Sequence, residues 1–192
     1  QTCALPISLC RETGAHVHLV HISSSDAVDL IRQAKAEGLS VTAETAQHYL
    51  FFEAGSIPDG DTRFKCAPPI RDSANREALW QALGNGTLDF VATDHSPAPN
   101  ELKETASGNL LLAWGGIAGL QFALPVLWTA ALARNYSVTD ISKWLCENPV
   151  KFLKLENSKG KIAKGFDADL CVWMPANNFT LQEEMIRSEE HT

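Results

Sequence analysis

Three polar side chains in this sequence each follow a short apolar run, which is where the catalytic residues of α/β enzymes usually lie. His21 ends the run 15–20, His48 follows 39–46, and Asp94 closely follows 90–92. In a parallel α/β barrel, residues at the carboxyl ends of strands face the active site. Imidazole and carboxylate groups bind zinc, iron, manganese or cobalt, and a carboxylate also takes a proton from an attacking water. The sequence therefore predicts a metal site, with the choice of metal open.

Each of these signals has a structural alternative. A lone histidine at a strand end is more often structural, and an aspartate before Ser-Pro is common turn chemistry. Three such positions at successive strand ends favour a shared function. His16 and His18 form an HxH pair, which is also a metal-binding pattern, but alternation along a strand separates their face from that of His21. We interpret the pair as structural residues, buried or facing a helix.

Composition narrows the class of protein. Hydrophobic residues make up 45% and charged residues 20% of the chain, as in globular proteins. No apolar run is long enough to span a membrane. The net charge of −7 and the lack of a basic cluster disfavour a nucleic-acid partner. The scattered cysteines suit reduced thiols, so we expect a cytoplasmic protein, with a peroxisomal one as the alternative, that binds a small molecule.

Strand-like and helix-like segments alternate along the chain, which predicts an α/β fold with a parallel sheet. We expect strands over 15–22, 39–49, 63–67 and 88–93, and helices over 26–37, 75–83, 119–134, 140–146 and 150–155. Pro125 is expected to bend or break the third helix. After Leu155 the pattern changes to turns and strand-like runs, which predicts a small β unit.

The two ends of the chain are encoded by one DNA string and its reverse complement. ACGTGTGCTCTTCCGATCT reads as residues 2–7, and AGATCGGAAGAGCACACGT reads as residues 187–192. The string resembles a common sequencing-library adapter, so we hypothesise that residues 1–8 and 187–192 are translated adapter rather than a coincidence. Between them we expect a barrel domain over 9–155 and part of a small β domain over 156–186, together a fragment of a longer protein.

Five motifs lie in order between residues 9 and 174: HVHLVHISS, AETAQHYL, KCAPPIRD, ATDHSP and WGGIAGLQ. Together they resemble the cyclic amidohydrolases, and within that superfamily the allantoinases. Lys103 before the last motif and the FALP run after it favour the allantoinases. The tail GFDADLCVW resembles the returning β strands of the superfamily. Hydantoinases (dihydropyrimidinases), dihydroorotases and non-catalytic dihydropyrimidinase-related scaffold proteins remain as alternatives.

The resemblance implies the C-terminal half of a (β/α)8 barrel, followed by part of a small β-sandwich domain. It implies two divalent metal ions, zinc in the first place, with iron, manganese or cobalt as alternatives. His21 and His48 would bind one metal and Asp94 the other, and Asp94 would also be the catalytic base. In the family an HxH pair and a carboxylated lysine complete the site, and both would precede the first strand of this chain.

The resemblance also implies substrate contacts through the main chains of Ala67 and Ala118. Ser96 could line the same site or cap a turn, and 67–69 could be a plain turn. The implied reaction is hydrolysis of the ring amide of allantoin to allantoate, in purine (ureide) catabolism, by a full-length homo-oligomer, a tetramer. Half a barrel would leave an open strand edge, so we expect residues 9–186 alone neither to fold stably nor to hydrolyse allantoin.

Overall fold

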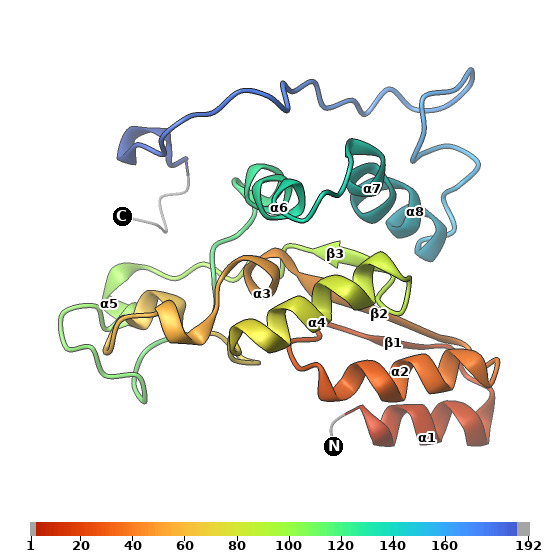
Figure 1. Cartoon of the computed structure of the whole chain (residues 1–192), viewed down its shortest axis with the longest axis horizontal. Helices are drawn as coiled ribbons and strands as arrows, with labels where there is room; N and C mark the ends of the chain where they lie inside the picture. Colours follow the sequence, from red (N-terminus) through yellow and green to blue (C-terminus); the bar gives the residue numbers. More distant parts are fainter. Residues whose placement is uncertain (1–2, 188–192) are drawn as a thin grey trace.

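The computed structural model of the chain describes residues 3–187 and contains a three-stranded parallel sheet (Figure 1). The strands are β1 (Val17–Leu19), β2 (Val41–Ala46) and β3 (Phe90–Ala92), in the order β1-β2-β3. β1 pairs with the first half of β2, and β3 pairs with its second half. The sheet therefore confirms the α/β class with parallel strands and places β2 at its centre.

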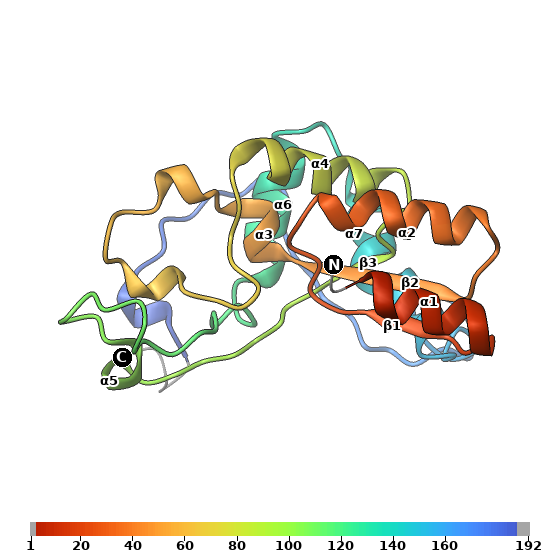
Figure 2. The ribbon, with the colours of Figure 1, turned by 90° about the horizontal axis from the view of Figure 1, so that it is seen from below.

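Helices lie on both sides of this sheet. In Figure 1, α1 (Ala4–Thr13) and α2 (Asp26–Ala36) lie below it, and α6 (Ala123–Leu132), α7 (Val138–Ser142) and α8 (Asn148–Phe152) lie above it. A π-helix, Lys143–Glu147, joins α7 to α8 and packs on β3. α4 (Ser73–Gly84) lies next to α2 in the view from below (Figure 2). The remaining elements are short: α3 (Gln47–Phe51), α5 (Asn100–Lys103) and the 3-10 helices Ala54–Ser56, Thr62–Phe64 and Glu183–Met185.

Side-chain caps explain where two of the helices begin. The Asp72 carboxylate accepts a hydrogen bond from the Asn75 backbone N–H at the start of α4. At the start of α7, Ser137 and Asp140 form a reciprocal capping box. Each cap satisfies a backbone donor that has no partner inside the helix, so the chain is directed into a helix at these residues.

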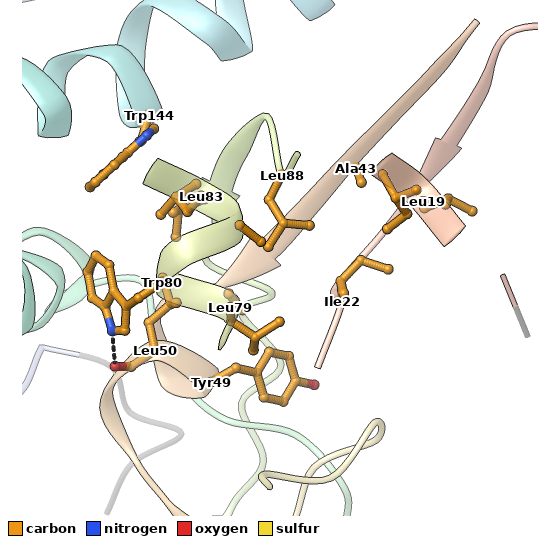
Figure 3. Packing of buried hydrophobic residues seen from close by; sticks show 14 of the residues in the cluster. Leu19, Ile22, Ala43, Tyr49, Leu50, Leu79, Trp80, Leu83, Leu88 and Trp144 are labelled. Atoms are coloured by element: carbon orange, nitrogen blue, oxygen red, sulfur yellow. Dashed lines mark hydrogen bonds between the residues drawn. The ribbon is translucent and has the colours of Figure 1, made fainter. Parts of the chain in front are cut away.

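The hydrophobic core joins the sheet to the helices around it, and Figure 3 shows its part around α4. Trp80 of α4 is 1% exposed, and its Nε1–H donates to the Leu50 carbonyl at 2.9 Å. Its indole stacks on Tyr136 and also lies against Trp144 of the π-helix. Because Leu50 belongs to α3, this single side chain joins α3, α4 and the helices after α6.

The prediction of a third strand over 63–67 is wrong. Residues 62–64 form a 3-10 turn because the Asp61 carboxylate accepts from the Arg63 backbone N–H and also pairs with its guanidinium. The helix expected over 119–134 begins only at Ala123. Pro125 consequently lies in the first turn, where its missing N–H is not needed, and it causes no bend.

The segment after α8 also differs from expectation. Residues 156–187 form no strand in the described structure, and the expected β domain over 156–186 stays a prediction. The segment instead runs back over α6 in extended form (Figure 1), where the Trp128 Nε1–H donates to the Pro175 carbonyl at 2.9 Å. A strand needs a partner to pair with, and none of the described strands lies beside this segment.

The adapter origin of the two chain ends stays a hypothesis. α1 crosses residue 8, the expected limit of the first adapter-derived segment, and a helix does not reveal the origin of its codons. Residues 1–2 and 188–192 lie outside the described residues. In the described part, no helix has the length and apolar character that crossing a membrane requires.

Replacing Trp80 by phenylalanine should lower the free energy of unfolding of the full-length protein by about 2–3 kcal/mol, because a buried carbonyl loses its donor and a cavity forms. Denaturant unfolding monitored by circular dichroism measures this change. Trp114→Phe is the matched control, since Trp114 is 48% exposed, and it should cost less than about 0.5 kcal/mol. Equal losses for the two variants would contradict the central role of Trp80.

Candidate active site

The three predicted metal ligands all lie just beyond the carboxyl ends of the parallel strands. Ala46 of β2 pairs with Ala92 of β3, so His48 and Asp94, each two residues further on, follow the same level of the sheet. Leu19 of β1 pairs with Ala43, so His21, two residues beyond Leu19, lies beside the second half of β2. Parallel pairing thus brings the three residues to one edge of the sheet.

The backbone turns sharply at two of these positions. His21 has φ = 41° and Asp94 has φ = 44°, in the left-handed region that residues other than glycine rarely adopt. The other non-glycine residues with positive φ, among those described, follow helix ends, where this conformation is common. Backbone strain at a strand end that carries a polar side chain is typical of functional sites.

His48 is the most buried of the three. It is 2% exposed, and in the described part of the chain neither ring nitrogen has a hydrogen-bond partner. Burial, with a smaller effect of nearby His21, lowers the pKa of His48 to about 4. The ring packs edge-on against Tyr49, with 4.1 Å between the centroids. A neutral imidazole with a free ring nitrogen is the form of histidine that binds a metal.

Asp94 lies near Tyr49 and Cys66. Burial is the main cause that raises the pKa of each of these two groups, and the Asp94 carboxylate adds to both effects. The Tyr49 hydroxyl donates to the Pro68 carbonyl at 2.8 Å. Asp94 therefore lies near Tyr49, the residue that follows His48 in α3.

The structure does not bring all three predicted ligands into one group. Among residues 3–187, no set of three or more histidine, cysteine, aspartate or glutamate side chains is arranged to hold a metal. The expected division, with two imidazoles on one metal and the carboxylate on the other, stays a prediction. The unpaired, buried His48 ring next to His21 is the observation that fits a metal.

His16 and His18 lie on a different face, as predicted. His18 shares hydrogen bonds with Thr42 (2.8 Å) and Glu44 (3.1 Å), and His16 shares one with Thr42 (3.0 Å). The His18 ring also stacks on Phe90. Both therefore act as structural residues of the β1–β2 pair, although His16 is exposed rather than buried.

The two segments with the expected main-chain contacts lie side by side. The Gly116 N–H donates to the Lys65 carbonyl at 2.9 Å, and the buried Lys103 ammonium donates to the carbonyls of both. Ala67 and Ala118 are each two residues further along from these anchors. Neither alanine uses its main-chain N–H or C=O in a hydrogen bond with another described residue.

Ser96 lies against the same loop. Its N–H donates to the Ile117 carbonyl at 3.1 Å, and a Cβ added to Gly116 would overlap its hydroxyl and carbonyl oxygens. Ser96 is half-buried next to Gly116, so both the lining role and the turn role predicted for it remain open.

Sequence reasoning missed Gln47. This residue begins α3 beside His48, is 3% exposed, and bonds main-chain carbonyls of two other segments. One signal was present, because the buried face of β2 carries Val41 and Ala43 and then turns polar at Thr45 and Gln47. A buried polar side chain must find a partner, and it finds one at the strand ends.

Comparison with known proteins identifies the family. Residues 3–188 match the amidohydrolase family. This chain belongs to that family. Among curated members, the amidohydrolase is 49% identical over 172 residues to an allantoinase of Arabidopsis thaliana, covering 89% of this chain and 34% of the relative. It is 46% identical over 175 residues to an allantoinase of Streptomyces avermitilis, covering 91% and 38%.

Solved structures of hydantoinases resemble this amidohydrolase chain. The D-hydantoinase (dihydropyrimidinase) of a Thermus species has a TM-score of 0.79 at 28% identity, covering 86% of this chain and 37% of that chain. The L-hydantoinase of Arthrobacter aurescens has a TM-score of 0.76 at 32% identity, covering 84% and 36%. The chain thus spans little more than a third of the length of the relatives it matches.

Gly115 and Gly116 provide a test of the loop geometry. A Cβ at Gly116 would overlap Ser96, whereas a Cβ at Gly115 would be at least 3.9 Å from its neighbours. Gly116→Ala should therefore lower the free energy of unfolding by about 1–3 kcal/mol, and Gly115→Ala should change it by less than about 1 kcal/mol. Thermal or denaturant unfolding of the full-length protein measures both. Equal effects of the two substitutions would show that the loop does not pack on Ser96.

Proposed function

We propose that the full-length enzyme hydrolyses the ring amide of allantoin to allantoate at a binuclear metal site, in purine (ureide) catabolism. The observation that carries this proposal is the buried, unpaired His48 ring beyond the end of β2, in a chain that is 44–49% identical to allantoinases of plant, bacterial and yeast origin. The proposal extends to the architecture, with this chain as the second half of a (β/α)8 barrel followed by a small β domain.

We assign His21 and His48 to one metal and Asp94 to the other. The buried His48 ring has two unpaired nitrogens, so it accepts a cation without giving up another bond. Two divalent cations, zinc in the first place, would supply Lewis acidity to the ring carbonyl and make a nearby water more acidic. An HxH pair and a carboxylated lysine, contributed by other parts of the protein, would complete the ligand set.

Asp94 moves the proton in this mechanism. Its carboxylate takes the proton from the attacking water as the new C–O bond forms at the ring carbonyl carbon. It then gives that proton to the ring nitrogen as the C–N bond breaks, so the ring opens to a carboxylate and a urea nitrogen. The left-handed backbone at Asp94 holds the carboxylate at the end of β3 for both transfers.

Main-chain groups hold the substrate in this scheme. A hydantoin ring alternates N–H and C=O groups, and the free N–H and C=O groups of Ala67 and Ala118 match that pattern. Lys103 fixes the two segments relative to each other through Lys65 and Gly116. Ser96, which packs on the same loop, is proposed to line this ring site.

A second candidate function is hydrolysis of other cyclic amides, because solved hydantoinase (dihydropyrimidinase) structures share the fold. Dihydroorotate is a further candidate ring, and a non-catalytic scaffold role is the alternative outside the enzyme class. The presence of His21, His48 and Asp94 supports an enzyme. We propose a cytoplasmic or peroxisomal homotetramer that binds a small molecule and neither nucleic acid nor membrane.

The full-length protein loaded with zinc should open the allantoin ring with a kcat/KM at least about 100-fold higher than for hydantoin, dihydrouracil or dihydroorotate, because hydrogen bonds to ring substituents discriminate strongly. Steady-state assays of the four compounds under identical conditions measure the ratio. A preference for dihydrouracil or hydantoin would favour the second candidate. Failure to open any of the four rings would favour the scaffold role.

Metal content distinguishes the proposed ligand from the structural histidines. His48→Asn should lower the bound zinc of the full-length protein from about two ions to about one per chain, because a lost ligand leaves that metal with too few donors. His18→Asn, which removes bonds to Thr42 and Glu44 instead, should retain both ions. Elemental analysis after dialysis measures the stoichiometry, and equal loss in both variants would overturn the assignment of His48.

A further inference from the structure

We propose that Gln47 is a positioning residue of the active site, which fixes the Asp94 strand end and the Ala118 loop relative to His48. This inference rests on the proposed function and adds to it a residue that contacts neither metal nor substrate. The observation behind it is a single buried carboxamide, whose nitrogen bonds two main-chain carbonyls next to those residues.

The hydrogen bonds of Gln47 reach the neighbours of two site residues. Its Nε2 donates to the Thr93 carbonyl at 3.3 Å and to the Gly119 carbonyl at 3.1 Å. Thr93 precedes Asp94, and Gly119 follows Ala118. Gln47 itself precedes His48 in α3. One side chain therefore connects three segments: the one that carries the proposed metal ligand His48, the one that carries the proposed proton carrier Asp94, and the loop proposed to bind substrate.

The orientation of this carboxamide is fixed by its chemistry. The nitrogen faces two carbonyl oxygens, and turning the amide over would place its own oxygen against them. Both N–H groups are used, while Oε1 is buried without a hydrogen-bond partner among the described residues. A buried acceptor without a partner is costly, so the residue retains this cost while its nitrogen bonds the two carbonyls at the strand ends.

Gly119 shows how closely the loop approaches Gln47. A Cβ added to Gly119 would overlap Gln47 Nε2 and lie 3.2 Å from the Thr93 carbonyl oxygen. Only glycine therefore allows this contact. The loop that carries Ala118 rests directly on the Gln47 amide and on the end of β3, so a change in the amide must move the loop.

The test compares one chemical change at the two ends of β3. Gln47→Glu replaces the donor with a carboxylate at the carboxyl end of the strand. Asn148→Asp makes the same replacement at the amino end, where Asn148 Nδ2 donates to the Asp89 carbonyl at 2.6 Å. Gln47→Met removes both bonds without adding charge, and Gly119→Ala displaces the loop with Gln47 intact. All four are made in the full-length protein.

Two readouts separate positioning from stability. In the first, kcat and KM are measured on the ring that the wild type opens. Both Gln47 variants and Gly119→Ala should lose about ten-fold or more in kcat/KM, since small misplacements near the chemistry are expensive. Asn148→Asp should stay within about two-fold of wild type despite a similar fall in melting temperature. In the second, the visible absorption spectrum of cobalt-loaded protein should shift for Gln47→Met and not for Asn148→Asp.

The test of Gln47 and the test of the proposed function can fail independently of each other. A wild type that opens no ring would refute the proposed reaction, and the cobalt spectra would still decide the role of Gln47. Equal behaviour of Gln47→Met and Asn148→Asp in both readouts would show that Gln47 is a purely structural residue and overturn the inference.

Discussion

The site depends on one continuous segment, β2 with α3, whose side chains donate hydrogen bonds to the main chain of four neighbouring segments. Thr45 Oγ1 donates to the Ile22 carbonyl at 2.7 Å, beside His21. Gln47 donates to the carbonyls of Thr93 and Gly119, and Tyr49 donates to that of Pro68. Each acceptor is adjacent in sequence to a predicted site residue. The central strand therefore sets the position of the other strand ends as well as its own.

Parallel pairing makes this arrangement possible and also makes it sensitive to the strand register. Side chains alternate along a strand, so a register slip of one residue would turn Thr45 and Gln47 away from the neighbours they bond. β1 and β3 each pair with only three residues of β2. Because these ladders are short, the strand register also depends on the buried polar contacts at the strand ends and on the core around Trp80. The Trp80 hydrogen bond joins α3 to α4.

The sequence predicted most of what periodicity and capping determine. The helices over 26–37 and 75–83 and three of the four strands were predicted, but the strand expected over 39–49 ends at Ala46, where α3 begins. The common edge at His48 and Asp94 follows from the strand register. The strand expected over 63–67 failed because the Asp61 carboxylate captures a backbone N–H, a local bond that outweighs an alternating pattern. Gln47 was missed because its partners, Thr93 and Gly119, are 46 and 72 residues away.

The chain resembles allantoinases in sequence and hydantoinases in structure, and both resemblances agree with a site built at the strand ends. The strand ends carry His21, His48 and Asp94, which we propose as the metal ligands and proton carrier, and their positions depend on the parallel pairing of β1, β2 and β3. In the proposed function, recognition of a particular ring depends on the loops at Ala67 and Ala118. Lys103 bonds the carbonyls of Lys65 and Gly116 in these loops, and Gln47 bonds that of Gly119. If main-chain atoms carry the contacts proposed here, specificity resides in how the loops are held rather than in which side chains they present. Substitutions that change the preferred ring should therefore accumulate in the residues that support the loops, while His21, His48 and Asp94 stay the same.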